Sequence, residues 1–276
     1  MEKVKAKVAL VTGASSGIGK STVTQLLNDG YIVYGAARRL EKMTDLKAAG
    51  AHILSMDVTD DKSMVDGINT IIAQQGQLDI LVNNAGYGSY GAVEDVPIEE
   101  AKRQFEVNIF GVARLTQLVL PYMRANHFGK IVNISSIGGK IYTPLGAWYH
   151  GTKHALECFS DCLRLETKSF GIDVIIIEPG AIKTEWGDIA LDNMRQTSGK
   201  GAYKSVVSGT IKMFQNSYKK GSSSSPDVIA TAISKALKAK KPKTRYATGA
   251  NAKPIIFLRW LLSDKIFDRV ILSMIK

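Results

Sequence analysis

The chain has 276 residues, of which 45% are hydrophobic and 22% charged, and its formal net charge is +11. This length and composition are typical of one large α/β domain with a sizeable core, and no apolar stretch near residue 1 has the form of a signal peptide, so we expect a cytoplasmic protein. Two cysteines and four scattered histidines form no ligand cluster, so we expect neither a disulfide framework nor a metal site.

Short apolar runs alternate with amphipathic stretches over most of the chain. The strand-like runs span 8–11, 32–36, 53–56, 80–82, 131–134 and 174–177, and the amphipathic stretches span 20–29, 41–48, 62–75, 99–126 and 149–170. Nearly continuous Val, Ile and Leu runs separated by helices are typical of a parallel sheet that is covered on both faces. The pattern therefore predicts an α/β fold.

A glycine-rich segment follows the first apolar run and precedes a stretch with helical spacing. It reads Thr12-Gly13-Ala14-Ser15-Ser16-Gly17-Ile18-Gly19. Glycines at such a turn let the backbone approach a pyrophosphate, which rests on the positive end of the following helix. The spacing is G-x-x-x-G-x-G rather than the usual G-x-G-x-x-G, and a glycine turn between strand and helix also occurs for steric reasons alone.

Tyr149 and Lys153 lie four residues apart, and Ser136 lies thirteen residues upstream of Tyr149. Residues at i and i+4 share one face of a helix, so the ammonium group can lie beside the phenol. A neighbouring cation favours the phenolate and brings proton transfer by a tyrosine closer to neutral pH. The Ser136 hydroxyl could then polarise a substrate carbonyl. A Tyr-x-x-x-Lys pair by itself is weak evidence, because most such pairs are solvated helix faces.

The regular alternation ends after Gly180. Residues 181–202 are polar without a strong period, which favours a loop or helical lid over about 181–220. Ser225, Pro226 and Asp227 are suited to the N-cap, first position and first turn of a helix that continues to about residue 240. Residues 245–248 form a candidate last strand. Much of the excess charge lies at 219–220 and 235–245, without interleaved aromatic residues, so we expect a solvated basic surface or attraction for an anionic cofactor, and no nucleic-acid partner.

The tail over 254–276 is apolar and basic. Its bulky apolar side chains recur at roughly helical spacing: Phe257, Leu258, Trp260, Leu261, Leu262, Phe267, Ile271 and Leu272. Charged residues interrupt the stretch too often for it to span a bilayer. We rank three fates for this surface: packing over a substrate cleft, packing on a neighbouring subunit, and peripheral contact with a membrane. It could also simply complete the core.

Together these motifs resemble those of the short-chain dehydrogenase/reductase superfamily, over residues 8 to 184 and by element pattern to about 248. The resemblance implies a Rossmann-type three-layer αβα sandwich with a doubly wound, mostly parallel seven-stranded sheet, in a single domain over 1–276. It implies an oxidoreductase that transfers a hydride between a nicotinamide cofactor and a carbonyl or alcohol carbon. The pattern and long tail are most similar to 17β-hydroxysteroid- and retinol-dehydrogenase-like members, which suggests a small hydrophobic alcohol or carbonyl substrate. Family members also suggest a homodimer or homotetramer, paired through the helices at 99–126 and 149–170.

The resemblance assigns roles residue by residue. The catalytic residues would be Asn108, which would hold a water, and Ser136, Tyr149 and Lys153. The cofactor-binding residues would be Gly13, Ser15, Ser16, Gly17, Ile18, Gly19, Arg38, Arg39, Asp57, Val58, Asn84, Ala85, Gly86, Tyr149, Lys153, Pro179, Gly180, Ile182 and Thr184. Other interpretations stay open: Asp57 could be a turn or cap aspartate, residues 83–86 a simple turn, and Asn108 a residue that caps or bends its helix.

The end of the second strand selects the cofactor. Sites that bind NAD place an acidic residue there for the ribose hydroxyls, but this chain has Ala37 at that position, followed by Arg38 and Arg39. A guanidinium group binds a 2′-phosphate through paired, charge-assisted hydrogen bonds. We therefore expect NADP(H) rather than NAD(H), with Arg38 as the first choice and Arg39 as the second. Two solvated arginines capping a strand are the alternative, and Ser16 weakens the prediction because many NADP-type members have a basic residue there.

Two other functions remain in view. One is a catalytically silent nucleotide-binding protein, which the intact set of four catalytic residues argues against. The other is a protein on the same fold that binds a membrane surface or a partner through residues 235–245 and the tail.

Overall fold

The seven strands of this computed structural model, which describes residues 6–217 and 222–276, form one sheet in the order β3-β2-β1-β4-β5-β6-β7. Every neighbouring pair is parallel. The strands are β1 Val8–Thr12, β2 Ile32–Ala37, β3 His52–Ser55, β4 Ile80–Asn83, β5 Gly129–Ile134, β6 Ile172–Pro179 and β7 Arg245–Thr248. The predicted doubly wound, seven-stranded Rossmann-type sheet is confirmed. Because β1 lies between β2 and β4, the direction of winding reverses there, where open α/β sheets bind ligands.

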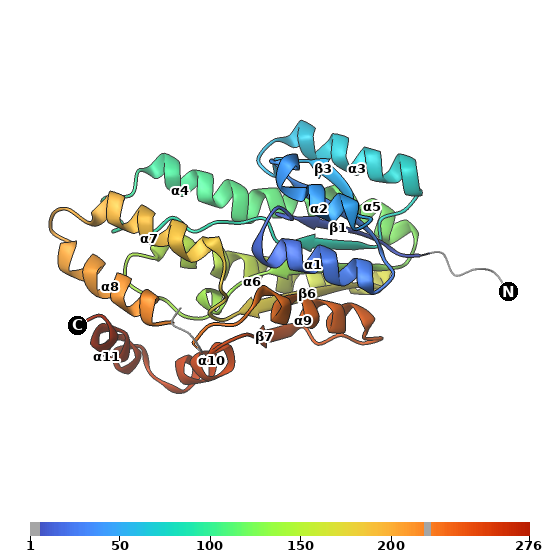
Figure 1. Cartoon of the computed structure of the whole chain (residues 1–276). Helices are drawn as coiled ribbons and strands as arrows, with labels where there is room; N and C mark the ends of the chain where they lie inside the picture. The colour runs from blue at the N-terminus through green and yellow to red at the C-terminus, as the bar shows by residue number, and fades with distance from the viewer. Residues whose placement is uncertain (1–5, 218–221) are drawn as a thin grey trace.

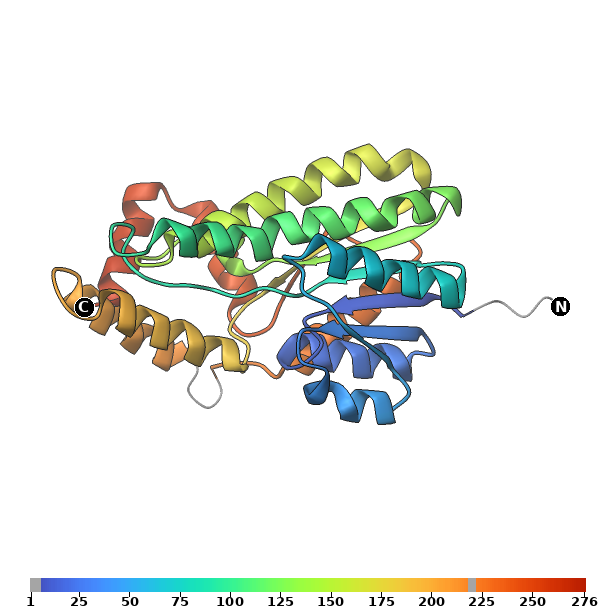
Figure 2. The ribbon, with the colours of Figure 1, turned by 90° about the horizontal axis from the view of Figure 1, so that it is seen from above.

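Helices cover both faces of the sheet (Figure 1). They are α1 Gly17–Asn28, α2 Thr44–Ala48, α3 Asp61–Gln75, α4 Ile98–Phe105, α5 Gly111–Ala125, α6 Ala147–Thr167, α7 Glu185–Ser198, α8 Lys204–Ser217, α9 Pro226–Lys238, α10 Ala252–Leu261 and α11 Asp264–Met274, with short turns η1 Leu40–Met43, η2 Glu106–Phe110, η3 Ile137–Gly139 and η4 Lys168–Phe170. The helices α1, α2 and α9 pack on one face, and α3, α5 and α6 pack on the other. Figure 2 shows the α4–α5 helix running alongside α6.

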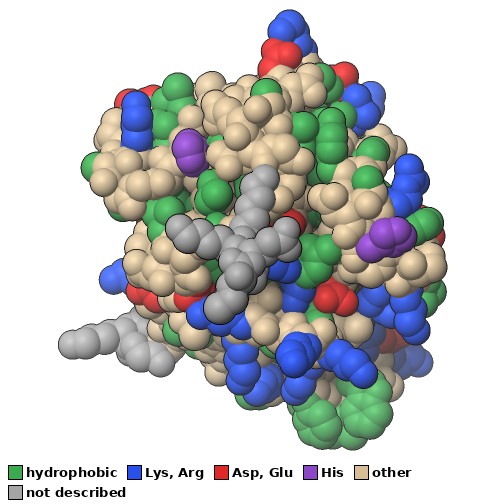
Figure 3. All heavy atoms as spheres, turned by 90° about the vertical axis from the view of Figure 1, so that its right-hand side faces the viewer, with side chains coloured by type: hydrophobic (Ala, Val, Ile, Leu, Met, Phe, Trp, Pro, Cys, Tyr) green, Lys and Arg blue, Asp and Glu red, His purple; other side chains and the backbone are tan. Residues whose placement is uncertain are grey.

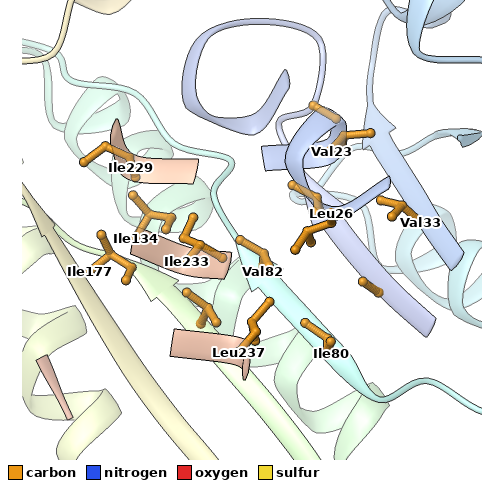
Figure 4. Packing of buried hydrophobic residues seen from close by; sticks show 14 of the residues in the cluster. Val23, Leu26, Val33, Ile80, Val82, Ile134, Ile177, Ile229, Ile233 and Leu237 are labelled. Atoms are coloured by element: carbon orange, nitrogen blue, oxygen red, sulfur yellow. The ribbon is translucent and has the colours of Figure 1, made fainter. Parts of the chain in front are cut away.

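Alternation along the strands sends apolar side chains to both layers. Ala9 and Val11 of β1 belong to the core cluster under α1 and α9, whereas Val8 and Leu10 belong to the cluster on the other face. Figure 4 shows the first cluster, in which Ile233 of α9 lies among strand residues. All these side chains are buried, because a parallel sheet with helices on both faces has no solvated side.

Several predicted boundaries need correction. The helix predicted over 99–126 is interrupted by a π-helical turn at η2, which no proline signals in the sequence. Such a turn inserts one extra residue and shifts the face that the following residues present; here it coincides with the buried Asn108. The lid region contains two helices, α7 and α8, up to Ser217, and its last predicted residues, 218–220, lie outside the described part of the chain. The tail forms α10 and α11.

The start of α9 is as predicted. Ser225 is the N-cap, and its hydroxyl accepts a hydrogen bond from the Asp227 N–H, with Pro226 at the first helical position. The last strand also has the predicted bounds, 245–248. None of the described helices is long and apolar enough to cross a bilayer.

The basic stretch over 235–245 lies at the amino edge of the sheet, because it leads into the start of β7. Its lysines at 235, 238, 240, 241 and 243 are exposed. Figure 3 shows Lys and Arg side chains gathered over the lower part of the face where β1 begins. This is the solvated basic surface that we predicted, at the opposite edge from the glycine loop; the lysines at 219–220 lie outside the described residues.

Candidate active site

The loop between β1 and α1 is shaped for close approach of a ligand to the backbone. Gly13 has a φ of +67°, and a Cβ there would lie 2.9 Å from Asn84 Nδ2. A Cβ at Gly19 would overlap the carbonyl oxygen of Gly13. The N-cap of α1, Ser16, makes no side-chain capping bond, and the first turn has no acidic residue. The N–H groups of this turn are therefore available to an anion such as a pyrophosphate.

Hydrogen bonds join this loop to the end of β4. The Thr12 Oγ1 accepts from the N–H groups of Asn84 and Ala85, each at 3.0 Å. In return, Asn84 Nδ2 donates to the Thr12 carbonyl at 2.9 Å. The 83–86 segment is thus more than a simple turn, because it fixes the position of the glycine loop beside it.

A cavity of about 1030 Å³ runs along the carboxyl edge of the sheet. It brings together almost all the predicted site residues: Gly13, Ser15, Ser16, Gly17, Ile18, Arg38, Arg39, Asp57, Val58, Asn84, Ala85, Gly86, Ser136, Tyr149, Lys153, Pro179, Gly180, Ile182 and Thr184. Two predicted residues do not line it. Gly19 packs behind the glycine loop, and Asn108 is buried behind the 86–87 backbone.

Ser136, Tyr149 and Lys153 all line this cavity. Ser136 Oγ accepts from the Gly138 N–H at 3.0 Å, at the start of η3. The Nζ of Lys153 donates to the Ile134 carbonyl at 2.8 Å and lies 6.0 Å from the centre of the Tyr149 ring. Burial lowers the pKa of Lys153 to about 8, although the negative charge of Glu157 opposes that shift. The ammonium form therefore still predominates at neutral pH.

Asn108 connects the η2 turn to two neighbouring segments. Its Nδ2 donates to the Tyr87 carbonyl at 2.9 Å and to Thr152 Oγ1 at 3.0 Å, and its Oδ1 accepts from the Tyr87 N–H at 3.2 Å. These bonds hold the 86–87 backbone against α6 at Thr152, the residue that precedes Lys153. The interpretation of Asn108 as a residue at a helix distortion agrees with the π-helical turn, and its water-holding role stays a prediction.

The two arginines after β2 are exposed at the cavity. Neither Arg38 nor Arg39 takes part in an ion pair among the residues that the structure describes, so both guanidinium groups can take an anion. Asp57 Oδ1 accepts from the N–H and Oγ1 of Thr59, at 3.0 and 2.8 Å. Asp57 is therefore a turn aspartate, as the alternative interpretation held, and its role in cofactor binding stays a prediction.

Aromatic rings that the sequence analysis missed surround Tyr149. The ring of Trp186 lies 5.0 Å from it and that of Tyr90 lies 5.6 Å from it, centre to centre. Phe214 of α8 packs on Tyr90 at 5.5 Å. No spacing in the sequence joins these residues, because they come from three separate segments. They enclose the phenol in an apolar wall that limits the access of water.

His150 is a buried packing residue. Its Nδ1 lies 3.0 Å from the Gly138 carbonyl, and its Nε2 lies 3.0 Å from Thr143 Oγ1. Burial lowers the pKa of His150 to about 4, so the ring is neutral at pH 7.

The far end of the cavity is apolar and is closed by the tail. Its lining includes Ile255, Leu258, Phe267, Val270, Ile271 and Met274 of α10 and α11. Phe267 and Ile271 pack on Ile141, in the segment that follows Ser136. This end of the cavity offers a surface for an apolar ligand beside the polar site.

A buried charged cluster lies behind the site. Lys140 Nζ lies 2.8 Å from Glu157 Oε2, and Arg245 Nε lies 3.0 Å from the same oxygen and 3.6 Å from Glu178 Oε1. Burial raises the pKa of Glu178 to about 7, with a further contribution from the charge of Glu157, against the opposing effect of Lys140 and Arg245. The cluster joins α6, β6 and β7 to the segment after Ser136.

Comparison with known proteins places the chain among relatives of similar length. The model of the short chain dehydrogenase family matches residues 7–193. A probable short-chain type dehydrogenase/reductase, VdlC, from Helicobacter pylori is 36% identical over 95% of each chain. The 3-ketodihydrosphingosine reductase of Bacteroides thetaiotaomicron is 36% identical over 88% of each chain. The NADPH-dependent 3-dehydrocapnine reductase of Ornithobacterium rhinotracheale is 36% identical over 96% of this chain and 95% of its own.

A solved structure has the same fold. The short-chain dehydrogenase from Streptomyces avermitilis superposes with a TM-score of 0.81 at 36% sequence identity, covering 97% of this chain and 96% of its own.

The pKa of Glu178 gives a testable pH dependence. The folded protein holds a proton on this carboxyl up to about pH 7, whereas an ordinary glutamate loses it near 4.5. The unfolded state therefore binds fewer protons between these values, and the free energy of unfolding of the wild type falls as pH rises from about 4.5 to 7. Glu178→Gln removes this loss, so its melting temperature relative to wild type should rise between pH 5 and pH 8, by about 2–4 °C per kcal/mol.

Differential scanning fluorimetry at a series of pH values measures this effect. Glu41→Gln, which replaces an exposed carboxylate on η1, is the control and should show no such trend. A melting-temperature difference for Glu178→Gln that stays constant with pH would contradict the assignment.

Proposed function

The chain belongs to the short-chain dehydrogenase family, and we propose that it is an NADP(H)-dependent oxidoreductase that interconverts an alcohol and a carbonyl group on a hydrophobic substrate. One observation carries the proposal. A single cavity joins three features: the N-terminus of α1, which no protein side chain caps; the polar groups of Ser136, Tyr149 and Lys153; and an apolar wall. This arrangement suits an anionic cofactor on one side and an apolar substrate on the other.

The cofactor fits the residues at its end of the cavity. The first turn of α1 and the glycine loop would hold the pyrophosphate, and Arg38 or Arg39 would hold the 2′-phosphate. The cofactor, when bound, supplies or accepts the hydride. Proton transfer and positioning fall to the side chains of the protein.

The four catalytic side chains divide proton transfer, charge stabilisation and positioning among them. Tyr149 donates a proton to the carbonyl oxygen in reduction and takes it back in oxidation. Ser136 stabilises the negative charge that develops on that oxygen through a hydrogen bond. The charge of Lys153 favours the phenolate form of Tyr149, and its ammonium group also binds the nicotinamide ribose. Asn108 keeps a water that connects Lys153 to solvent.

The substrate side supports a hydrophobic ketone or alcohol. We assign α7 and α8, within the predicted lid, and the tail helices to substrate enclosure, because they supply the apolar wall beyond Tyr149. Two relatives are named for reductases of 3-keto or 3-dehydro compounds, which supports reduction of a ketone. A catalytically silent nucleotide-binding protein is the alternative, and turnover by the wild type would exclude it.

Tyr149→Phe should remove most turnover and leave NADPH binding nearly intact, because the ring still packs but carries no proton. We expect a loss of about 10²–10⁴-fold in kcat, the usual contribution of a general acid. Absorbance at the NADPH band with a panel of apolar ketones measures turnover, and NADPH fluorescence measures binding. Tyr31→Phe, at the residue before β2, is the control. Wild-type rates in Tyr149→Phe would show that the catalytic assignment is wrong.

Arg38→Ala should weaken NADPH binding by roughly 10–100-fold, the range expected for loss of hydrogen bonds to a charged group. NADH lacks the 2′-phosphate, so its affinity should change little. Titration of both dinucleotides into wild type, Arg38→Ala and Arg39→Ala separates the two arginines. An equal loss for both dinucleotides, or a wild type that prefers NADH, would count against the 2′-phosphate role.

We also propose a homodimer or homotetramer built on α4, α5 and α6. Two large apolar side chains are exposed on this surface: Phe110, which is 56% exposed, and Leu165, which is 68% exposed. Leu165→Glu should place a charge in the interface and lower the mass measured by multi-angle light scattering. Leu40→Glu, on η1, is the matched control and should keep the wild-type mass. A wild type that is a stable monomer at micromolar concentration would refute this assembly.

A further inference from the structure

The two C-terminal helices present two different faces. The inner face, with Phe267 and Ile271 among its residues, is buried and lines the cavity. The outer face is exposed, and several of its side chains are large and apolar. Figure 1 shows α10 and α11 at the lower edge of the molecule, outside the sheet and its covering helices. Core packing therefore explains the inner face and leaves the outer face unexplained.

The outer face of α10 is aromatic. Phe257 is 58% exposed, Trp260 78% and Leu261 60%, and these positions share one side of the helix with Lys253. The rings of Phe257 and Trp260 lie 5.9 Å apart, centre to centre. Two adjoining aromatic rings and a leucine held in water are unfavourable, and contiguous patches of this kind mark interaction surfaces.

The outer face of α11 adds basic groups beside apolar ones. Lys265 and Arg269 are exposed, as are Ile266 and Leu272. None of the ion pairs within residues 6–217 and 222–276 involves Lys265, Arg269 or Lys253. These three basic groups are therefore not neutralised by an ion pair, and Lys253 lies on the aromatic side of α10.

The two acidic residues of the tail are exposed, but each has a polar partner. Asp264 Oδ1 lies 2.6 Å from the Arg259 guanidinium group, and Asp268 Oδ1 accepts from the Tyr142 hydroxyl at 2.9 Å. Arg259 itself lies over the rings of Tyr142 and Phe267. The Asp264 and Arg259 charges therefore offset each other, and the positive charges of Lys253, Lys265 and Arg269 outnumber the one negative charge of Asp268.

We propose that the outer face of α10 and α11 docks onto a lipid bilayer that carries anionic headgroups. Tryptophan and phenylalanine prefer the boundary between headgroups and acyl chains, and basic side chains beside them bind anionic lipid. Helices with this pattern lie in the plane of the interface, and neither helix can cross the bilayer. A second copy of the chain fits this face less well, because it would bring the same positive charges together.

The proposal also gives the substrate a route, and this step rests on the proposed function. The helices whose outer face meets the bilayer are those whose inner face lines the apolar end of the cavity. A hydrophobic ketone or alcohol dissolved in lipid could then enter the cavity at α10 and α11 without crossing bulk water.

Co-sedimentation of the full chain with vesicles tests the docking surface. Vesicles of phosphatidylcholine with phosphatidylglycerol should bind the wild type at least tenfold more tightly than phosphatidylcholine alone, and added salt should weaken the binding. Lys265→Glu with Arg269→Glu should reduce affinity for the anionic vesicles by about fivefold or more per side chain. Phe257→Ser with Trp260→Ser should reduce it at least tenfold. Lys42→Glu with Lys47→Glu, on the far side of the molecule, is the matched control and should bind as wild type does.

Tryptophan fluorescence supplies an independent reading of the same contact. Brominated lipid in the anionic vesicles should quench the emission of the wild type, and Trp260→Ser should lose this quenching although Trp148 and Trp186 remain. These measurements need neither turnover nor cofactor, so they can succeed or fail independently of the proposed function, and the far-ultraviolet circular dichroism and melting temperature of each variant show that it is folded. Equal binding of wild type and tail variants, or no binding to anionic vesicles, would overturn the proposal. So would a change in assembly mass caused by Phe257→Ser with Trp260→Ser, because it would place a second copy on this face.

Discussion

The hydrogen bonds between the carboxyl ends of β1 and β4 are the constraint on which the site depends. Where parallel strands end, the next backbone groups have no sheet partner and must find one elsewhere. Here the Thr12 hydroxyl accepts from the N–H groups of Asn84 and Ala85, and the Asn84 side chain returns a hydrogen bond to the Thr12 carbonyl. The two loops therefore satisfy each other. Their fixed separation, which the absence of a side chain at Gly13 permits, defines one wall of the cavity.

The reactive side chains are held in the same way, by the ends of neighbouring strands. Lys153 on α6 donates to the last carbonyl of β5, and the charged cluster of Glu157, Glu178 and Arg245 joins α6 to β6 and β7. This arrangement buries charges that water would solvate better, which is why the pKa values of Lys153 and Glu178 both shift toward the neutral form. A fixed geometry around Tyr149 is thus obtained at some expense of stability.

The sequence predicted the part of the molecule in which local pattern and tertiary structure agree. Six apolar runs, the 245–248 strand and the Ser225 cap were all confirmed, because period and capping chemistry act over a few residues. The glycine loop and the position of Ser136, Tyr149 and Lys153 around one cavity followed from the family resemblance. The π-helical turn at Asn108, the rings of Trp186 and Phe214 on Tyr90 and Tyr149, and the raised pKa of Glu178 could not be predicted, because each arises from contacts between segments far apart in the chain.

The two halves of the cavity are built from different parts of the chain. The sheet and its loops form the half that suits an anionic cofactor, whereas α7, α8, α10 and α11, all after β6, form the apolar half. These later helices are also joined to one another: the backbone of α8 at Gly209 lies so close to the Ile275 carbonyl that any side chain there would overlap it. A displacement of α11 must therefore act on α8, which carries Phe214 of the aromatic wall near Tyr149. Since α11 has one face on the cavity and another on the surface, a contact at that surface is mechanically connected to the substrate side of the site.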